Sequence, residues 1–125
     1  MSPIEELQRI NETGKMTING REYAFTAMRH KERRKVFAFF TSIRGQLEEN
    51  SFAFMDEPKF DEIMGVIENL VTFDGSLLSR LGTHWDLYSQ DFVEFVVTAM
   101  GAMSYPFLVG SRTVSQSAGV PREKI

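Results

Sequence analysis

The segment from Gln90 to Met103 constrains the fold more than any other part of this 125-residue chain. Read as a helix, it has only one narrow stripe of polar or small positions, at Asp91, Glu94, Thr98 and Gly101. Nearly every other position is apolar, so such a helix must be covered around most of its circumference. The cover could come from the rest of one subunit, or from a second subunit or a bound partner.

The apolar side chains of this helix are candidates for an interface. We expect them to serve self-association or the binding of a client protein, and the residues concerned are Phe92, Val93, Val96, Val97, Met100 and Met103. Burial within one subunit is the alternative for the same residues, because one side of such a helix can always face the core of its own domain.

A β-hairpin is predicted at residues 15–25. The sequences "MTI" and "REYAF" flank Asn19-Gly20, a strong two-residue turn signal because both residues tolerate positive φ. An isolated hairpin is marginally stable in water, so its apolar face must pack on helices. We therefore predict a mainly α fold with a small N-terminal β-hairpin (α+β), with three to five helices in a single compact domain.

Helical patterns account for most of the remaining chain. The first residues carry a capping-box pattern, so residues 1–14 are predicted to be an N-terminal helix or arm. A long helix capped by Thr26 is expected to end near residue 50, and a middle helix is expected to begin at Pro58. Residues 15–108 then form the helical domain, and the Gly- and Ser-rich residues 109–125 are predicted to be a flexible polar tail.

The composition narrows the function classes. The chain has 14 basic and 17 acidic side chains, a net charge of −3, which argues against a surface given over entirely to nucleic acid. Charge is uneven, with a net of +2 in residues 1–50 and −7 in residues 51–108. The absence of cysteine excludes disulfides and thiolate catalysis. Without a signal peptide or a long uncharged apolar run, we expect a soluble cytoplasmic protein.

A basic run lies at the start of the predicted long helix. Its cations are Arg29, Lys31, Arg33, Arg34 and Lys35. Positive charge at a helix N-terminus opposes the helix dipole, which is a weak indication that the charge is used elsewhere. Three interpretations stay open: solvated helix surface, a docking face for an acidic partner, and a nucleic-acid contact. On a helix these cations wrap around rather than share the one face that a groove-reading helix needs.

No motif in the sequence indicates catalysis. Phosphate-binding loops and dinucleotide fingerprints are absent. His84 and Asp86 stand two residues apart, but they supply too few donors for a metal site. We therefore predict a protein that is not an enzyme and uses no cofactor.

The order of these elements resembles that of a known family. The hairpin "TINGREYAF", a long helix, a middle helix, the stretch "FDGSLLSRLGTHWDLYSQDFVEFVVTAMGAMSYPFL" and a polar tail are similar to the tail assembly chaperones of long-tailed, lambda-like bacteriophages. The resemblance covers roughly residues 15–108. It rests on element order, size and the aromatic-Pro-Phe ending, and the family offers no invariant site residues to carry over.

The resemblance implies a non-enzymatic role in viral tail assembly. Such a chaperone binds the tape measure protein, keeps its apolar helices soluble and helps tail tube protein assemble around it. It works in the bacterial host cytoplasm, self-associates as a homo-oligomer, has no membrane partner and is absent from the mature virion. This chain would correspond to the shorter of two products made by frameshifting. The alternative is a small regulatory nucleic-acid-binding protein that uses the basic run at residues 29–35.

Overall fold

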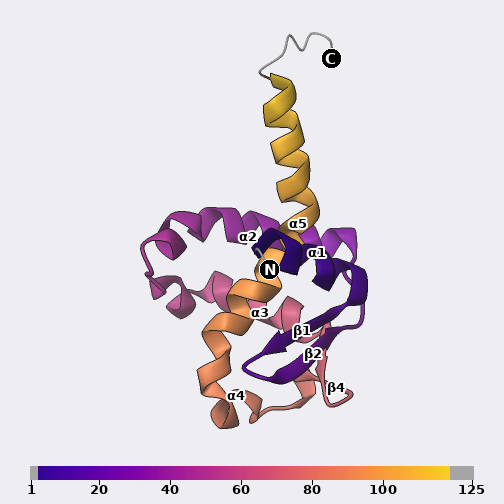
Figure 1. Cartoon of the computed structure of the whole chain (residues 1–125). Coiled ribbons are helices and arrows are strands. Elements are labelled where there is room, and N and C mark those ends of the chain that lie inside the picture. The colour runs from indigo at the N-terminus through magenta and orange to yellow at the C-terminus, as the bar shows by residue number, and fades with distance from the viewer. Residues whose placement is uncertain (1–2, 119–125) are drawn as a thin grey trace.

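The computed structural model describes residues 3–118, with side chains placed for residues 4–109. Its main elements are α1 (Pro3–Thr13), β1 (Lys15–Ile18), β2 (Arg21–Phe25), α2 (His30–Glu48), α3 (Pro58–Glu68), β3 (Val71–Phe73), β4 (Ser76–Leu77), α4 (His84–Leu87) and α5 (Phe92–Ala118) (Figure 1). Three short 3-10 helices, η1 (Ala53–Asp56), η2 (Leu78–Arg80) and η3 (Ser89–Asp91), connect them. The predicted fold class is confirmed: one mainly helical α+β domain with a hairpin near its N-terminus.

The predicted hairpin is one half of a four-stranded antiparallel sheet of order β1-β2-β3-β4. Asn19 and Gly20 form its turn with φ values of 50° and 81°. A second hairpin, which the sequence analysis did not predict, joins β3 to β4 through Asp74-Gly75, again with positive φ at both residues. Strand β3 pairs with β2, so the middle of the chain is joined to its N-terminal part.

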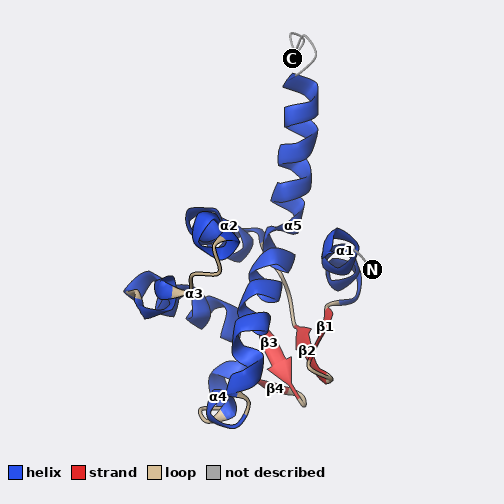
Figure 2. Cartoon of the chain, turned by 60° about the vertical axis from the view of Figure 1, so that its left-hand side comes forward, coloured by secondary structure: helices blue, strands red, loops and turns tan. Residues whose placement is uncertain are grey.

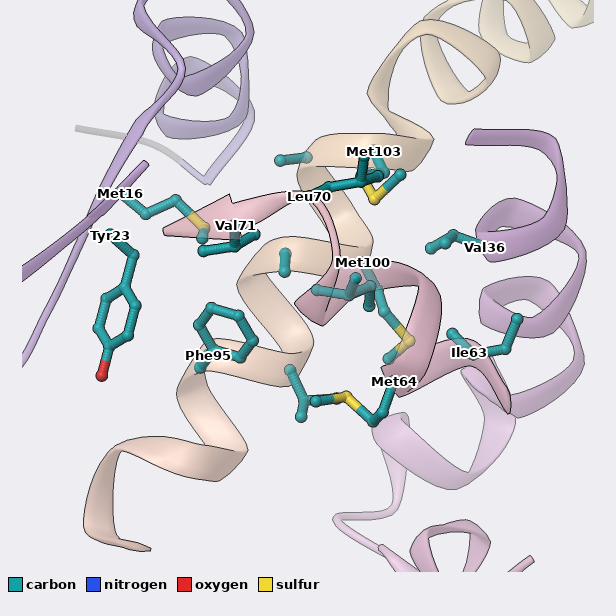
Figure 3. Packing of buried hydrophobic residues seen from close by; sticks show 14 of the residues in the cluster. Met16, Tyr23, Val36, Ile63, Met64, Leu70, Val71, Phe95, Met100 and Met103 are labelled. Carbon is teal, nitrogen blue, oxygen red and sulfur yellow. The ribbon is translucent and has the colours of Figure 1, made fainter. Parts of the chain in front are cut away.

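Helix α5 is the centre of the fold. Its first turns lie between the sheet on one side and α2 and α3 on the other, and α1 also packs against it (Figure 2). Figure 3 shows Phe95, Met100 and Met103 of α5 pointing into a core that they share with Tyr23 of β2 and Val36 of α2. The apolar circumference of α5 is therefore covered largely by its own subunit.

The narrow polar stripe predicted for residues 90–103 does not form a continuous solvent-exposed face. A Cβ atom added at Gly101 would lie 3.3 Å from Leu7 Cδ2, so the glycine allows α1 to pack closely on α5. Asp91 is fully buried, whereas Glu94 is exposed. The stripe thus serves packing at one end and a buried polar cluster at the other.

Two predicted helix boundaries are wrong. Thr26 does not cap α2, because that helix begins at His30. Instead, the N–H of Thr26 donates to the carbonyl of Leu70 at 2.7 Å and extends the β2–β3 pairing. The last helix does not end at Met103 but continues through Pro106 to Ala118, and its C-terminal part leaves the body of the molecule (Figure 1). Residues 109–118 of the predicted tail are thus helical, and residues 119–125 lie outside the described residues.

Helix α5 continues past its internal proline because side chains from other helices donate hydrogen bonds in place of the N–H that Pro106 lacks. Pro106 has no N–H for the carbonyl of Ala102. Asn11 Nδ2 donates to that carbonyl at 2.9 Å, and Arg33 Nη1 donates to the carbonyl of Met103 at 3.2 Å. Helices α1 and α2 therefore hold α5 at the position where its own hydrogen-bond ladder is interrupted.

Candidate functional site

An open groove with a volume of about 580 Å³ lies between α3 and the α4–α5 region. Apolar side chains make up its floor and one edge: Phe60, Met64, Trp85, Phe92 and Val93. Val93 is 41% exposed at the groove edge. Leu87 of α4 is 68% exposed but lines a separate, smaller hollow with Phe73 and Leu81. Large apolar side chains that stay accessible beside a groove are typical of binding surfaces rather than of a closed core.

Helix α3 forms one wall of the groove. Pro58 occupies its first turn. Ile63 and Ile67 are buried in the core, and Phe60 and Met64, which are also buried there, additionally line the groove. Gly65 also lines the groove, and a Cβ atom added there would meet nothing within 4 Å. Glycine within a helix costs about 1 kcal/mol relative to alanine, so the sequence keeps this wall open at the expense of helix stability.

Three carboxylates line the groove. Asp61, Glu68 and Asp86 line it, and no Lys, Arg or His side chain of the described residues does. Glu68 accepts a hydrogen bond from Trp85 Nε1 at 2.9 Å, which fixes the indole at the groove. Asp61 and Asp86 are exposed and form no ion pair within residues 4–109. The site therefore combines an apolar floor with unneutralised negative charge.

A buried polar cluster supports the end of α5 that carries Phe92 and Val93. Asp91 accepts from Arg21 Nε at 2.6 Å and Nη2 at 2.9 Å, from Asn19 Nδ2 at 2.8 Å and from Tyr23 Oη at 3.1 Å. Tyr23 Oη also lies 2.8 Å from His84 Nε2. Since the carboxylate can only accept, both bonds of Tyr23 are satisfied when Tyr23 donates to Asp91 and His84 donates from Nε2 to Tyr23.

The cluster has the composition of a proton relay but the geometry of a structural anchor. The four hydrogen bonds use the acceptor capacity of the Asp91 carboxylate, so no lone pair remains for a substrate. Burial raises the pKa of Tyr23, with the bond to Asp91 adding to the effect, and burial lowers the pKa of His84. Tyr23 therefore stays protonated and His84 neutral near pH 7, and both fix the hairpin to α4 and α5.

Stability in acid reports on this anchor. The bond from Arg21, with further bonds from Asn19 and Tyr23, lowers the pKa of Asp91 from 3.8 to about 2. A lowered pKa stabilises the fold above the unfolded pKa, and that contribution disappears as pH falls through the folded value. Because Arg21 is 28% exposed, solvent screens its ion pair with Asp91. We therefore expect the free energy of unfolding to fall by about 1–2 kcal/mol between pH 5 and pH 2. Urea denaturation across that range measures it.

The matched comparison for the acid experiment is Asp91→Asn, which has no carboxylate to titrate at this position. The difference in free energy of unfolding between wild type and variant should shrink as the pH falls from 5 to 2. A difference that stays constant over this range would contradict the assignment of the low pKa to Asp91.

The basic run is not one surface. Arg29, Lys31, Arg34 and Lys35 are exposed, and Arg29 lies 3.7 Å from Glu32. Arg33, predicted as a partner-binding residue with the others, is half-buried and turns inward, so it is not presented with these four cations. Its Nε donates to the carbonyl of Met28 at 2.9 Å, and its Nη2 donates to Asn11 Oδ1 at 2.9 Å, beside the carbonyls near Pro106. Burial lowers the pKa of this guanidinium.

The six residues predicted to form an interface on α5 differ in their exposure. Val96, Met100 and Met103 are fully buried in their own subunit, so the prediction that they meet a partner is wrong. Phe92 and Val97 are half-buried. Of the six, Phe92 and Val93 line the groove. The reason is that the sheet, α1 and α2 together surround α5, which periodicity in a single segment cannot reveal.

Several residues of the site were missed or misassigned by sequence reasoning. Asp91 has the pattern of a first-turn acid that complements the helix dipole, and nothing local links it to Asn19 or Arg21, about seventy residues away. Gly65 carried a usable signal, since a glycine within a strong helical pattern often has a packing or functional reason. His84 and Asp86 do not come together as ligands, because His84 is buried against Tyr23 and Asp86 is exposed.

Comparison with known proteins adds no identity: no family model, curated protein or solved structure matches the chain. No group of three potential His, Asp or Glu ligands occurs among the described residues. One helical segment, Ser89–Val109, is long and apolar enough to cross a membrane by length and composition. It is the central core helix of this fold, and such helices commonly pass that test.

Proposed function

We propose that this chain is a non-enzymatic tail assembly chaperone of a long-tailed bacteriophage. It binds the tape measure protein and promotes assembly of tail tube protein around it, acting as a homo-oligomer in the bacterial host cytoplasm and staying out of the mature virion. The observation that carries the proposal is the open apolar groove between α3 and α5, together with the resemblance in element order.

The groove suits a helical client. An α-helix with its side chains is about 10 Å across and presents apolar anchors at i, i+3, i+4 and i+7 to such a surface. Aromatic walls from Trp85 and Phe92 offer large contact area, and the thioether of Met64 adapts to different anchors. A chaperone that keeps apolar helices soluble needs adaptable contacts of this kind.

The nucleic-acid alternative has less support. Arg33 faces the interior, and the four exposed cations are spread around the start of α2 rather than gathered on one face. A regulator of this kind needs a cationic surface that tracks phosphates, with binding that falls steeply as salt rises. We keep it as the outcome that the first experiment would reveal.

Co-expression with the tape measure protein encoded in the same genome tests the proposal. The complex is purified through a tag on this chain after nuclease treatment. We expect a stable, nuclease-resistant complex. If instead no complex forms and the untreated preparation contains nucleic acid, the chaperone proposal is wrong and the regulator gains support.

Val93→Glu is expected to reduce capture of the tape measure protein at least tenfold, because a charge replaces an apolar contact of roughly 1.5 kcal/mol at the groove edge. Ile4→Glu is the matched control: Ile4 has the same apolar character, is 39% exposed and lies on α1, outside the groove. Capture by the control should fall less than twofold. Equal capture by both folded variants would show that the client binds elsewhere.

A further inference from the structure

We infer that the groove selects one chemical class of partner: an amphipathic helix whose apolar anchors are flanked by lysine or arginine. Gly65 is the specificity-determining position, because it lets that helix approach the backbone of α3. This inference makes the proposed function more specific. It depends on the proposed function in one respect, that the tape measure protein is the natural source of the helix.

The spacing of side chains along α3 supports this reading. Asp61, Gly65 and Glu68 all line the groove and follow one another at i, i+4 and i+7, which places them on one face of the helix. The wall is therefore a gap with a carboxylate on either side, and the two carboxylates are about 10 Å apart along the helix axis. An incoming helix that crosses at the gap meets negative charge on both flanks.

The opposite wall adds a third carboxylate. Asp86 lies beside Trp85 on α4, is exposed and has no ion-pair partner within the described residues. Lys59, the basic residue nearest in sequence to this wall of α3, is engaged with Glu62 at 3.4 Å and does not line the groove. Among residues 4–109, no basic side chain in the groove offsets these carboxylates. A client with acidic flanks is therefore repelled, and one with basic flanks is attracted.

A second copy of the chain is a poorer match. The densest group of exposed cations among the described residues lies at the start of α2, where Val36 and Phe39 are buried in the core and the ring centroids of Phe37 and Phe107 are 4.8 Å apart. That face offers charge without the exposed apolar stripe that the groove floor requires. Occupation by a second copy is nevertheless an outcome that the experiment distinguishes.

Trp85 provides a direct probe of binding. It is the only tryptophan in the chain and lines the groove, so its fluorescence reports on occupation by a tryptophan-free peptide. The probes are two synthetic amphipathic helical peptides with the same Leu and Phe stripe, one flanked by lysine and the other by glutamate. We expect the lysine peptide to bind at least tenfold more tightly at low salt, with the ratio shrinking as salt rises.

Two glycine substitutions form a matched pair. Gly65→Leu fills the groove wall, whereas Gly45→Leu adds the same side chain to an exposed position of α2, and in both cases an added Cβ meets nothing within 4 Å. Both changes favour helix formation, so both variants should remain folded. We expect Gly65→Leu to weaken lysine-peptide binding at least tenfold and Gly45→Leu to change it less than twofold. The double variant Asp61→Asn, Asp86→Asn should remove most of the preference for lysine over glutamate.

Each contrary outcome overturns a specific statement. Equal affinity for the two peptides, or equal effects of the two leucine variants, overturns the inference. A third result would assign the groove to a second copy and would also overturn the inference. In that result, neither peptide binds, the wild type forms an oligomer, and Gly65→Leu dissociates it. If Gly65→Leu does not change capture of the tape measure protein, the tape measure protein is not the source of the helix that binds the groove, but the chaperone proposal stays intact. Peptide results as expected with no capture leave the inference intact and overturn the chaperone proposal.

Discussion

Replacement of Asp91 by alanine is expected to lower the free energy of unfolding by about 3 kcal/mol, the lower end of the range for breaking a buried ion pair. The variant leaves Arg21 without its carboxylate and removes the acceptor of Asn19 and Tyr23. Arg21 is 28% exposed and regains part of its hydration, which keeps the loss at the lower end. Urea denaturation at pH 7 measures the effect.

Asp86→Ala is the control for this experiment. Asp86 is an exposed carboxylate five residues earlier, so its loss should change stability by less than about 0.5 kcal/mol. If Asp91→Ala lowers the free energy of unfolding by less than about 1 kcal/mol, the anchor role is contradicted, because buried polar groups that lose their partner destabilise the fold by more than that.

Because Asp91 directly precedes Phe92 and Val93, we also expect the Asp91→Ala variant to bind groove ligands less well.

Replacement of Arg33 by alanine is expected to lower the free energy of unfolding by roughly 2–3 kcal/mol, whereas the same change at Arg34 should cost less than about 0.5 kcal/mol. The residues are neighbours in the basic run with the same side chain. Only Arg33 donates to the carbonyls of Met28 and Met103 and to Asn11. Its loss leaves α5 short of donors at the position where Pro106 supplies none. Thermal and urea denaturation of the two variants measure the difference.

A second substitution identifies the cause of the Arg33 effect. Pro106→Ala restores an N–H that can donate to the carbonyl of Ala102, so it should recover part of the stability lost in Arg33→Ala. Equal destabilisation by Arg33→Ala and Arg34→Ala would mean that the inward contacts contribute nothing.

Local patterns predicted much of the fold. The turn at Asn19-Gly20 needs positive φ at two successive residues, a requirement that these residue types meet on their own. Pro58 predicted the start of α3, and the apolar run after Asp91 predicted a helix that needs nearly complete cover. In each case the deciding interactions join residues within a few positions of each other. The end of α5 escaped prediction because the donors that support it come from α1 and α2.

The candidate site was far less predictable. Phe92 and Val93 were expected at an interface and do line the groove, yet the same periodicity also nominated Val96, Met100 and Met103, which are buried. Periodicity shows that a helix face is apolar but cannot show whether the covering surface belongs to the same subunit. The charge run likewise could not separate Arg33 from Arg34, since the choice depends on which one meets free carbonyls.

The sequence by itself determined the class of fold, the hairpin turn, the position of most helices and the need to cover α5. Those features depend on backbone preference and on periodic burial, which are properties of short segments. Only the tertiary structure decided which polar groups are paired and which apolar groups stay accessible. Asp91 meets Arg21 seventy residues away, and Trp85 meets Glu68 across the groove. The cost of desolvating a charge or leaving an apolar surface open is set by contacts between distant segments, and those exist only once the chain has folded.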